Sequence, residues 1–265
     1  IPRVLSHGIN LDRLMFCSDG LDPTDLVQYG HIDHCVRESI KLGLNPIDAI
    51  SMASKNCFDY YNMNKDLGGI APGKLADILI FDDLKSVKPN KVFVGGKLVV
   101  SNGSIVTSVK KKVIPSWIKN TIKLKKLSPK DFAIQSKKKS VIANTIFMQT
   151  EIITKLGSAE LFTENGNVIT SFDKDVWKVA SFDRIHGTNK HAIGFLENFG
   201  ADIGAFASTW SFHENDMIVI GSNDSDMSIA ANILIKNQGG LVVVKSGKVI
   251  ASLPLQLAGI ISTDS

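Results

Sequence analysis

The stretch FCSDG, residues 16–20, ends a short apolar run with a carboxylate at the point where the chain is expected to turn. An Asp followed by Gly is common turn chemistry, and this structural role is one interpretation of Asp19. The other interpretation is catalytic, because residues 13–17 are predicted to form a buried strand and catalytic groups of barrel enzymes lie at the C-terminal ends of strands. The residues alone leave both interpretations open.

Two helices are predicted after this strand. Apolar residues recur at three- and four-residue spacing over residues 26–40, which indicates a helix with one apolar face. Asp33 and Arg37 lie one turn apart on this helix and are expected to pair. The second helix is expected to begin at Asn45, a suitable N-cap, because Pro46 then occupies the first helical position.

The pattern changes to β-strands from Gly68 onward. A strand is expected at residues 76–81, and the pair Gly95-Gly96 is typical of a primed hairpin turn between two alternating strands. The sequence therefore predicts a small sheet after the helices.

An α+β segment is predicted beyond about residue 140. The expected strands fall within residues 176–183, 204–211, 217–222 and 241–253, the last being a hairpin that turns at Ser246-Gly247. One amphipathic helix is expected after residue 223, with Asp224 or Ser225 near its cap and Met227, Ala230, Ala231 and Leu234 on its apolar face.

Lysine dominates the stretch between these two regions. Residues 110–139 contain eleven lysines and one acidic residue, Asp131, within a chain whose net charge is +4. A contact with nucleic acid is one interpretation, but only Trp117 and Phe132 interleave the lysines and could stack on bases. We therefore favour a solvated, partly helical connector between domains.

Length and composition are those of an ordinary globular protein. The chain has 265 residues, of which 44% are hydrophobic and 21% charged, enough for one large domain or two to three small ones. Its three cysteines are widely spaced, which favours a reducing compartment over a disulfide framework. The sequence carries no secretory signal and no run of 18 apolar residues, so a soluble, cytoplasmic protein is expected.

Two groups of histidines are candidate sites. His31 and His34 lie three residues apart, a spacing compatible with a shared metal ion, although an exposed or helix-capping pair is the alternative that we favour. The segment FDRIHGTNKH contains Asp183, His186 and His191 around a glycine turn, where acid and base groups meet, although an ordinary loop has the same composition. His213 belongs to an alternating segment that is equally compatible with the solvent face of a strand.

Several of these segments together resemble a known enzyme family. Residues 16–63 and 67–99 are similar to the C-terminal part of adenine deaminases of the amidohydrolase superfamily. Residues 183–208, with the later motifs IGSNDSDM, GGLVVV and LPLQLAGIIS, resemble the extra C-terminal domain of those deaminases. The strand GKLADI (73–78) marks only the superfamily, whereas the helix GHIDHCVR (30–37) and the C-terminal motifs make the resemblance specific.

The resemblance implies a fold that is α/β plus α+β. Residues 1–66 would be the last strand and helices of a metal-dependent (β/α)8 amidohydrolase barrel, and residues 67–109 a small β-sandwich portion. The lysine-rich connector would span residues 110–139, and an appended adenine deaminase-type C-terminal α+β domain would span residues 140–265.

The resemblance also implies an activity, which is the hydrolysis of adenine to hypoxanthine and ammonia by metal-activated hydroxide. The metal would be Mn²⁺ or Fe²⁺, with Zn²⁺ as an alternative. Asp19 matches the aspartate that ends strand eight, contacts the metal and shuttles the proton. His186, in HGT, also matches the family pattern and is carried over as a catalytic residue. The implied partners are adenine or a similar purine base and a second copy in a homodimer, with no nucleic acid and no membrane.

Three departures from the family pattern bear on function. The metal ligands of the earlier barrel strands have no counterpart, so we expect a missing N-terminal barrel segment to supply them and this piece alone to be inactive. Gly20 stands where the family has a second aspartate. Residues 212–216 match none of the specified residues of the family's His-Asp-x-His-Asn motif. Two alternatives stay open: a related amidohydrolase acting on another purine or cyclic amide, and a non-catalytic subunit.

Overall fold

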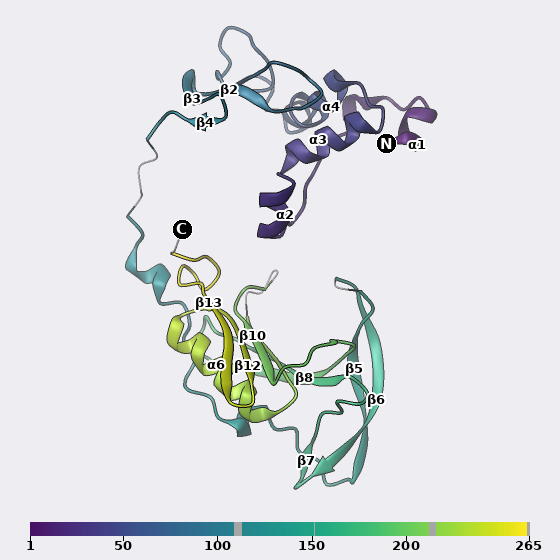
Figure 1. Ribbon diagram of the computed structural model, residues 1–265, viewed down its shortest axis with the longest axis vertical. Helices are drawn as coiled ribbons and strands as arrows, with labels where there is room; N and C mark the ends of the chain where they lie inside the picture. The colour runs from purple at the N-terminus through teal and green to yellow at the C-terminus, as the bar shows by residue number, and fades with distance from the viewer. Residues whose placement is uncertain (109–112, 151, 212–215, 264–265) are drawn as a thin grey trace. The chain divides into compact units, whose positions relative to one another are not determined.

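The computed structural model describes residues 1–108, 113–150, 152–211 and 216–263, and the chain forms two compact units (Figure 1). Unit 1 comprises Ile1–Lys111 and unit 2 comprises Lys112–Ser265. Each unit has hydrophobic clusters of its own. Among the helices that the structure describes, none is long and apolar enough to cross a membrane.

The first part of unit 1 is helical. A 3-10 helix at Leu11–Arg13 accompanies five short helices, which are α1 (Pro2–Ser6), α2 (Pro23–Gln28), α3 (Ile32–Lys41), α4 (Pro46–Met52) and α5 (Lys55–Tyr60). Val36, Leu44, Ala49 and Met52 are buried together in the small core of this unit. Asn45 caps α4 as predicted, because its side-chain oxygen accepts a hydrogen bond from the Ile47 amide at 2.9 Å.

The prediction of a buried strand at residues 13–17 is wrong. This segment lies outside the strands that the structure describes, and Leu14, Met15 and Phe16 are only half-buried. Its Phe16 amide bonds to the Met52 carbonyl of α4 at 3.1 Å instead of to a neighbouring strand. A strand needs a ladder of paired backbone groups, and the described part of unit 1 places no strand beside this segment.

The single helix predicted over residues 26–40 is divided into α2 and α3. Gly30 separates them with φ +100°, a backbone conformation outside the helical region. Asp33 then accepts a hydrogen bond from the His31 amide at 2.8 Å, which helps to start α3. The predicted pair of Asp33 and Arg37 is confirmed, with Oδ2 and Nη1 2.5 Å apart.

The second part of unit 1 is a four-stranded antiparallel sheet. Its strands follow the chain order β1 (Ile78–Phe81), β2 (Pro89–Val94), β3 (Lys97–Ser101) and β4 (Ser104–Ile105). Gly95 and Gly96 join β2 to β3 with φ values of 54° and 77°. Two successive residues at positive φ are what a type I′ turn requires, so the predicted hairpin is confirmed.

Unit 2 is built around a nine-stranded sheet of order β13-β12-β10-β11-β8-β9-β5-β6-β7. The strands are β5 (Ser140–Met148), β6 (Thr154–Glu164), β7 (Asn167–Val168), β8 (Val176–Phe182), β9 (His191–Glu197), β10 (Ala205–Ser208), β11 (Met217–Gly221), β12 (Gly240–Lys245) and β13 (Lys248–Pro254). The described strand pairs of this sheet are antiparallel except for β5 with β9, which is parallel. The hairpin turn at Ser246-Gly247 is confirmed.

One helix, α6 (Asp224–Asn237), covers part of this sheet (Figure 1). Met227, Ala230, Ala231 and Leu234 are all fully buried in the main core, as the apolar face predicted. The N-cap is Asn223, one residue before the predicted cap, and its side chain accepts from the Asp226 amide at 2.8 Å.

Part of the lysine-rich stretch belongs to the core of unit 2. Ile122 and Leu124 are buried while Lys123 and Lys125 between and beside them are exposed. Phe132 is fully buried and meets the Phe182 ring edge-on, with centroids 5.4 Å apart. The segment thus combines a solvated lysine face with apolar residues that anchor it to unit 2.

Candidate functional site

Asp19, the first residue predicted to be functional, is exposed in unit 1. Its backbone has φ 55°, and its Oδ1 accepts a hydrogen bond from the Gly20 amide at 2.8 Å. The turn predicted from Asp-Gly is therefore present. This local bond leaves Oδ2 for other partners, so the turn does not exclude a chemical role.

A cavity of about 240 Å³ adjoins this turn in unit 1. Cys17 and Ser18 line it from the Asp19 side, and Tyr29, His31 and His34 line it from the helices. The two predicted histidines have separate neighbours: Ser18 Oγ lies 3.0 Å from His31 Nε2, and the His34 ring lies on Tyr29 with centroids 5.4 Å apart. His31 is exposed and occupies the N-cap position of α3 without a side-chain capping hydrogen bond, whereas His34 is half-buried, so an exposed or helix-capping pair describes only His31 in part.

The residues present do not by themselves make a metal centre. Across the described ranges, no three His, Cys, Asp or Glu side chains gather closely enough to hold a metal ion. Catalytic zinc sites use three protein ligands, more than the single carboxylate of Asp19 could provide.

His186 lies in the loop of residues 183–190 that joins β8 to β9 in unit 2. Its side chain is 75% exposed, and its Nδ1 lies 2.9 Å from Asp183 Oδ1. Asp183 also accepts from the amides of Ile185 and His186 at 3.2 and 3.1 Å and from the Thr188 hydroxyl at 2.7 Å. These hydrogen bonds, led by that from Thr188, hold the pKa of Asp183 well below its usual range.

The buried side chain of Arg184 anchors the same loop. Its side chain is 1% exposed and reaches the Ala258 carbonyl at 3.0 Å and the Thr121 hydroxyl at 3.3 Å. Burial lowers the pKa of Arg184, while the charge of Asp216 opposes that change. Arg184 therefore holds the loop in place, whereas His186 points toward solvent.

The other residues that the sequence suggested as site candidates have no clear place in a site among the described residues. The histidine of the WSFHEN segment, His213, lies in residues 212–215, outside the described residues. Asp216 beside it accepts from the Ser181 hydroxyl at 2.9 Å, a contact between β8 and the start of β11. His191 stacks on Phe182 with ring centroids 5.2 Å apart and is not among the partners of the Asp183 carboxylate described above.

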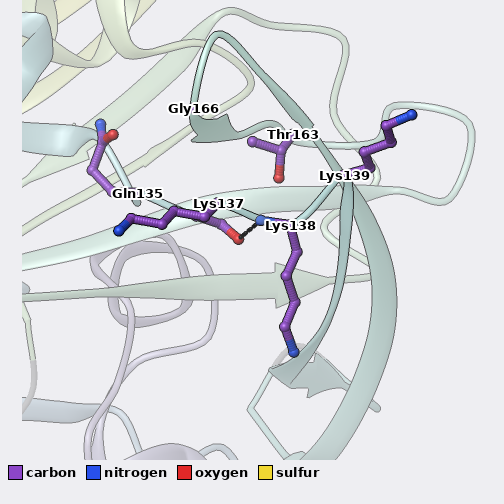
Figure 2. A pocket seen from close by; sticks show the side chains of 7 residues that line it. Gln135, Lys137, Lys138, Lys139, Thr163 and Gly166 are labelled. Carbon is purple, nitrogen blue, oxygen red and sulfur yellow. Dashed lines mark hydrogen bonds between the residues drawn. The ribbon is translucent and has the colours of Figure 1, made fainter.

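A basic pocket of about 680 Å³ lies in unit 2 beside the start of β5. Lys137, Lys138 and Lys139 line it together with Gln135 and Thr163. Figure 2 shows the three lysine side chains pointing in different directions rather than toward a common point. The pocket is therefore a basic surface and not an assembled anion site.

The sequence did not single out Asp183 as the residue that organises its loop. The signal is the spacing Asp-x-x-His-x-Thr over residues 183–188, which places two backbone amides, an imidazole and a hydroxyl within reach of one carboxylate. Such local bonds are common in turns, so the spacing alone does not distinguish a site from a turn.

Comparisons with known proteins match both units. The amidohydrolase family model matches residues 1–99, and the model of the adenine deaminase C-terminal domain matches residues 151–265. An adenine deaminase of Cenarchaeum symbiosum (strain A) is 56% identical over 264 residues, which cover 100% of this chain and 43% of that protein. Adenine deaminases of Desulforamulus reducens and Kosmotoga olearia are 35% and 36% identical, over 99% and 96% of this chain and 45% and 44% of their own lengths.

The chain thus spans less than half the length of these curated relatives. The two family matches lie in the same order as the predicted parts, with the amidohydrolase match first. Residues 1–99 thus match the amidohydrolase family and residues 151–265 the adenine deaminase C-terminal domain, and the chain as a whole is similar to the C-terminal portion of proteins named adenine deaminase.

Proposed function

We propose that the protein containing this chain hydrolyses adenine to hypoxanthine and ammonia. The observation that carries the proposal is the 56% identity to an adenine deaminase over the whole chain, in both units. Two further features support it: Ser18 and Leu21, on either side of the Asp19 turn, line a cavity, and the exposed His186 side chain projects from an anchored loop.

Asp19 is the proposed proton-handling carboxylate. A carboxylate within reach of the attacking water can take its proton and return it to the leaving amine, a role that typically contributes 10²- to 10⁴-fold to a rate. We also propose Asp19 as one ligand of a divalent cation, which would be Mn²⁺, Fe²⁺ or Zn²⁺. The other ligands would come from the part of the full-length protein that corresponds to the unmatched part of the relatives. His186 is the second proposed catalytic residue.

The proposed domain division follows the same assignment. Residues 1–66 would be the end of a (β/α)8 barrel and residues 67–109 part of a β-sandwich. Residues 110–139 would be a connector whose later part packs into the core of the appended domain, and residues 140–265 would be the rest of that domain. A missing N-terminal barrel segment and a second copy of the protein are the proposed partners, and purine salvage in the cytoplasm is the proposed setting.

A chimaera tests the proposed substrate. The N-terminal part of the Cenarchaeum symbiosum adenine deaminase would be joined to this chain in place of its own matching segment, and ammonia release would be measured with adenine, guanine and a cyclic amide. We expect a folded chimaera to release ammonia from adenine at a rate within tenfold of the parent enzyme. A folded chimaera that prefers guanine or the cyclic amide, or that is inactive on all three, would contradict the proposal.

A further inference from the structure

The loop between β8 and β9 contains a carboxylate whose hydrogen-bonding capacity is used within the loop. Asp183 Oδ1 accepts from the amides of Ile185 and His186 and lies 2.9 Å from His186 Nδ1, while Oδ2 accepts from Thr188 Oγ1 at 2.7 Å. A carboxylate oxygen has about two acceptor sites, so the three contacts on Oδ1 fill that oxygen, while Oδ2 has the one contact with Thr188. Asp183 Oδ1 is therefore committed to its neighbours in the loop, His186 among them.

The protonation of Asp183 decides which nitrogen of His186 carries the proton. Its pKa lies well below the usual range because Thr188 and the loop amides donate to it, so the group is an ionised acceptor at neutral pH. An ionised carboxylate cannot donate, so the contact at Nδ1 requires a proton on that nitrogen. In the neutral imidazole, Nε2 is then the nitrogen with the free lone pair.

The loop around this pair is fixed at both ends. The Asp183 amide donates to the Lys190 carbonyl at 3.0 Å, which closes the loop at its base. Arg184 is buried beneath the loop and bonds to the Ala258 carbonyl. The His186 side chain is nevertheless 75% exposed, whereas that of Asp183 is only 19% exposed. The imidazole is thus presented to solvent on a loop that is anchored.

We propose that Asp183 is a positioning residue that holds neutral His186 in its Nδ1–H tautomer and so presents Nε2 as a hydrogen-bond acceptor to an N–H donor. The class of donor rests on the proposed function, in which the exocyclic amine or a ring N–H of an aminopurine fits an imidazole acceptor. Aspartate fixes the tautomer of catalytic histidines in the same way in well-studied triads. The tautomer itself does not depend on which reaction the protein carries out.

Nitrogen NMR of the 265-residue chain tests this directly. The imidazole ¹⁵N shifts of His186 would be read from two-bond ¹H–¹⁵N correlations at pH about 9, where an ordinary imidazole is neutral. The signal would be assigned by its loss in His186→Gln. We expect a protonated Nδ1 and an unprotonated Nε2; a predominantly protonated Nε2 in the wild-type chain would overturn the proposal.

Two variants separate positioning from a general effect of charge. Asp183→Asn should lose the strong preference for the Nδ1–H form, because the neutral amide can present either a donor or an acceptor to Nδ1. Asp173→Asn removes an exposed carboxylate from the same unit and should leave the His186 signals unchanged. Retention of the wild-type tautomer in Asp183→Asn would refute the role of Asp183. If Asp183→Asn does not fold, the tautomer of His186 in the wild-type chain still tests the proposal.

This measurement needs neither substrate nor the rest of the enzyme. An Nδ1–H tautomer in a chain whose chimaera does not deaminate adenine would support the positioning role and contradict only the proposed function. An active chimaera with an Nε2–H tautomer would do the reverse.

Discussion

Gly204 lies against a buried carboxylate, and replacing it with alanine should destabilise unit 2 strongly. A Cβ at this position would overlap Asp226 Oδ2, lie 2.7 Å from its Cγ and lie 3.0 Å from the Val244 carbonyl oxygen. Asp226 is 3% exposed, and its carboxylate accepts from the amides of Ser246 and Gly247 at 3.1 and 2.8 Å. The substitution therefore pushes this carboxylate away from the turn between β12 and β13.

The magnitude follows from these contacts. Losing one charge-assisted hydrogen bond costs about 1.5–3 kcal/mol, and forcing an atom into filled space adds about 1–3 kcal/mol. Alanine returns about 0.4–1 kcal/mol because it restricts the unfolded chain. We expect Gly204→Ala to lower the free energy of unfolding by about 2–5 kcal/mol.

Urea unfolding followed by tryptophan fluorescence measures this loss. All three tryptophans lie in unit 2, and Trp177 is 1% exposed, so the signal reports on that unit. Gly194→Ala in β9 is the matched control, because its Cβ would meet no atom within 4 Å, and it should change stability by less than about 1 kcal/mol.

A double-mutant cycle identifies the carboxylate as the cause. In an Asp226→Ala background the overlapping oxygen is absent, so Gly204→Ala should cost no more than about 1 kcal/mol further. If the two substitutions were additive, the clash with Asp226 would not be the source of the loss, and our reasoning would be refuted.

Two further predictions concern unit 2. Thr188→Val removes the hydroxyl that donates to Asp183 at 2.7 Å and should raise the pKa of that carboxyl toward its ordinary value. A carboxyl whose pKa is lowered by folding stabilises the folded state at any pH above its unfolded-state pKa, and this contribution is lost as the pH falls. Thr188→Val should therefore be less stable than wild type near pH 7, and the difference should shrink below about pH 4. Urea unfolding at pH 7 and pH 3 checks this, and an equal difference at both pH values would contradict it. Phe132→Ala should cost about 3–5 kcal/mol because its ring is fully buried, and a fluorescence-detected loss below about 1 kcal/mol would mean that the lysine-rich stretch is not part of this core.

Local signals predicted much of the fold. The glycine pair at 95–96 and the glycine of Ser246-Gly247 marked their hairpins because glycine adopts positive φ without steric cost. The buried face of α6 followed from its spacing. The Asn45 cap and the Asp33–Arg37 pair were equally local.

Features that depend on contacts between distant residues, or on a weak or interrupted sequence pattern, were not predicted. Residues 13–17 have a strand-like pattern, but a strand forms only where another strand pairs with it. The break at Gly30 interrupts an apolar period that is otherwise continuous. The long hairpin of β5 and β6 exposes Ile142 and Leu156 on its outer face, so its alternation of apolar and polar residues is weak.

The candidate site was predictable only in part. Asp19 was found from its place after an apolar run and from a family resemblance, and the structure adds the adjoining cavity. His186 was one of several polar residues noted around a glycine turn, and the resemblance alone gave it a catalytic role. The role of Asp183 depends on the way in which eight loop residues fold back on one carboxylate, and composition does not specify that geometry.

The rate of ammonia release from adenine by the chimaera, with and without Asp19→Asn, tests the central claim most directly. Asp22→Asn is the matched control, because Asp22 is a nearby exposed carboxylate at the N-cap position of α2, and its side chain makes no capping hydrogen bond that the substitution would remove. We predict that Asp19→Asn lowers kcat by at least about 100-fold with the fold intact, while Asp22→Asn leaves it within about threefold. Equal rates for wild type and Asp19→Asn would contradict a proton-handling role for Asp19.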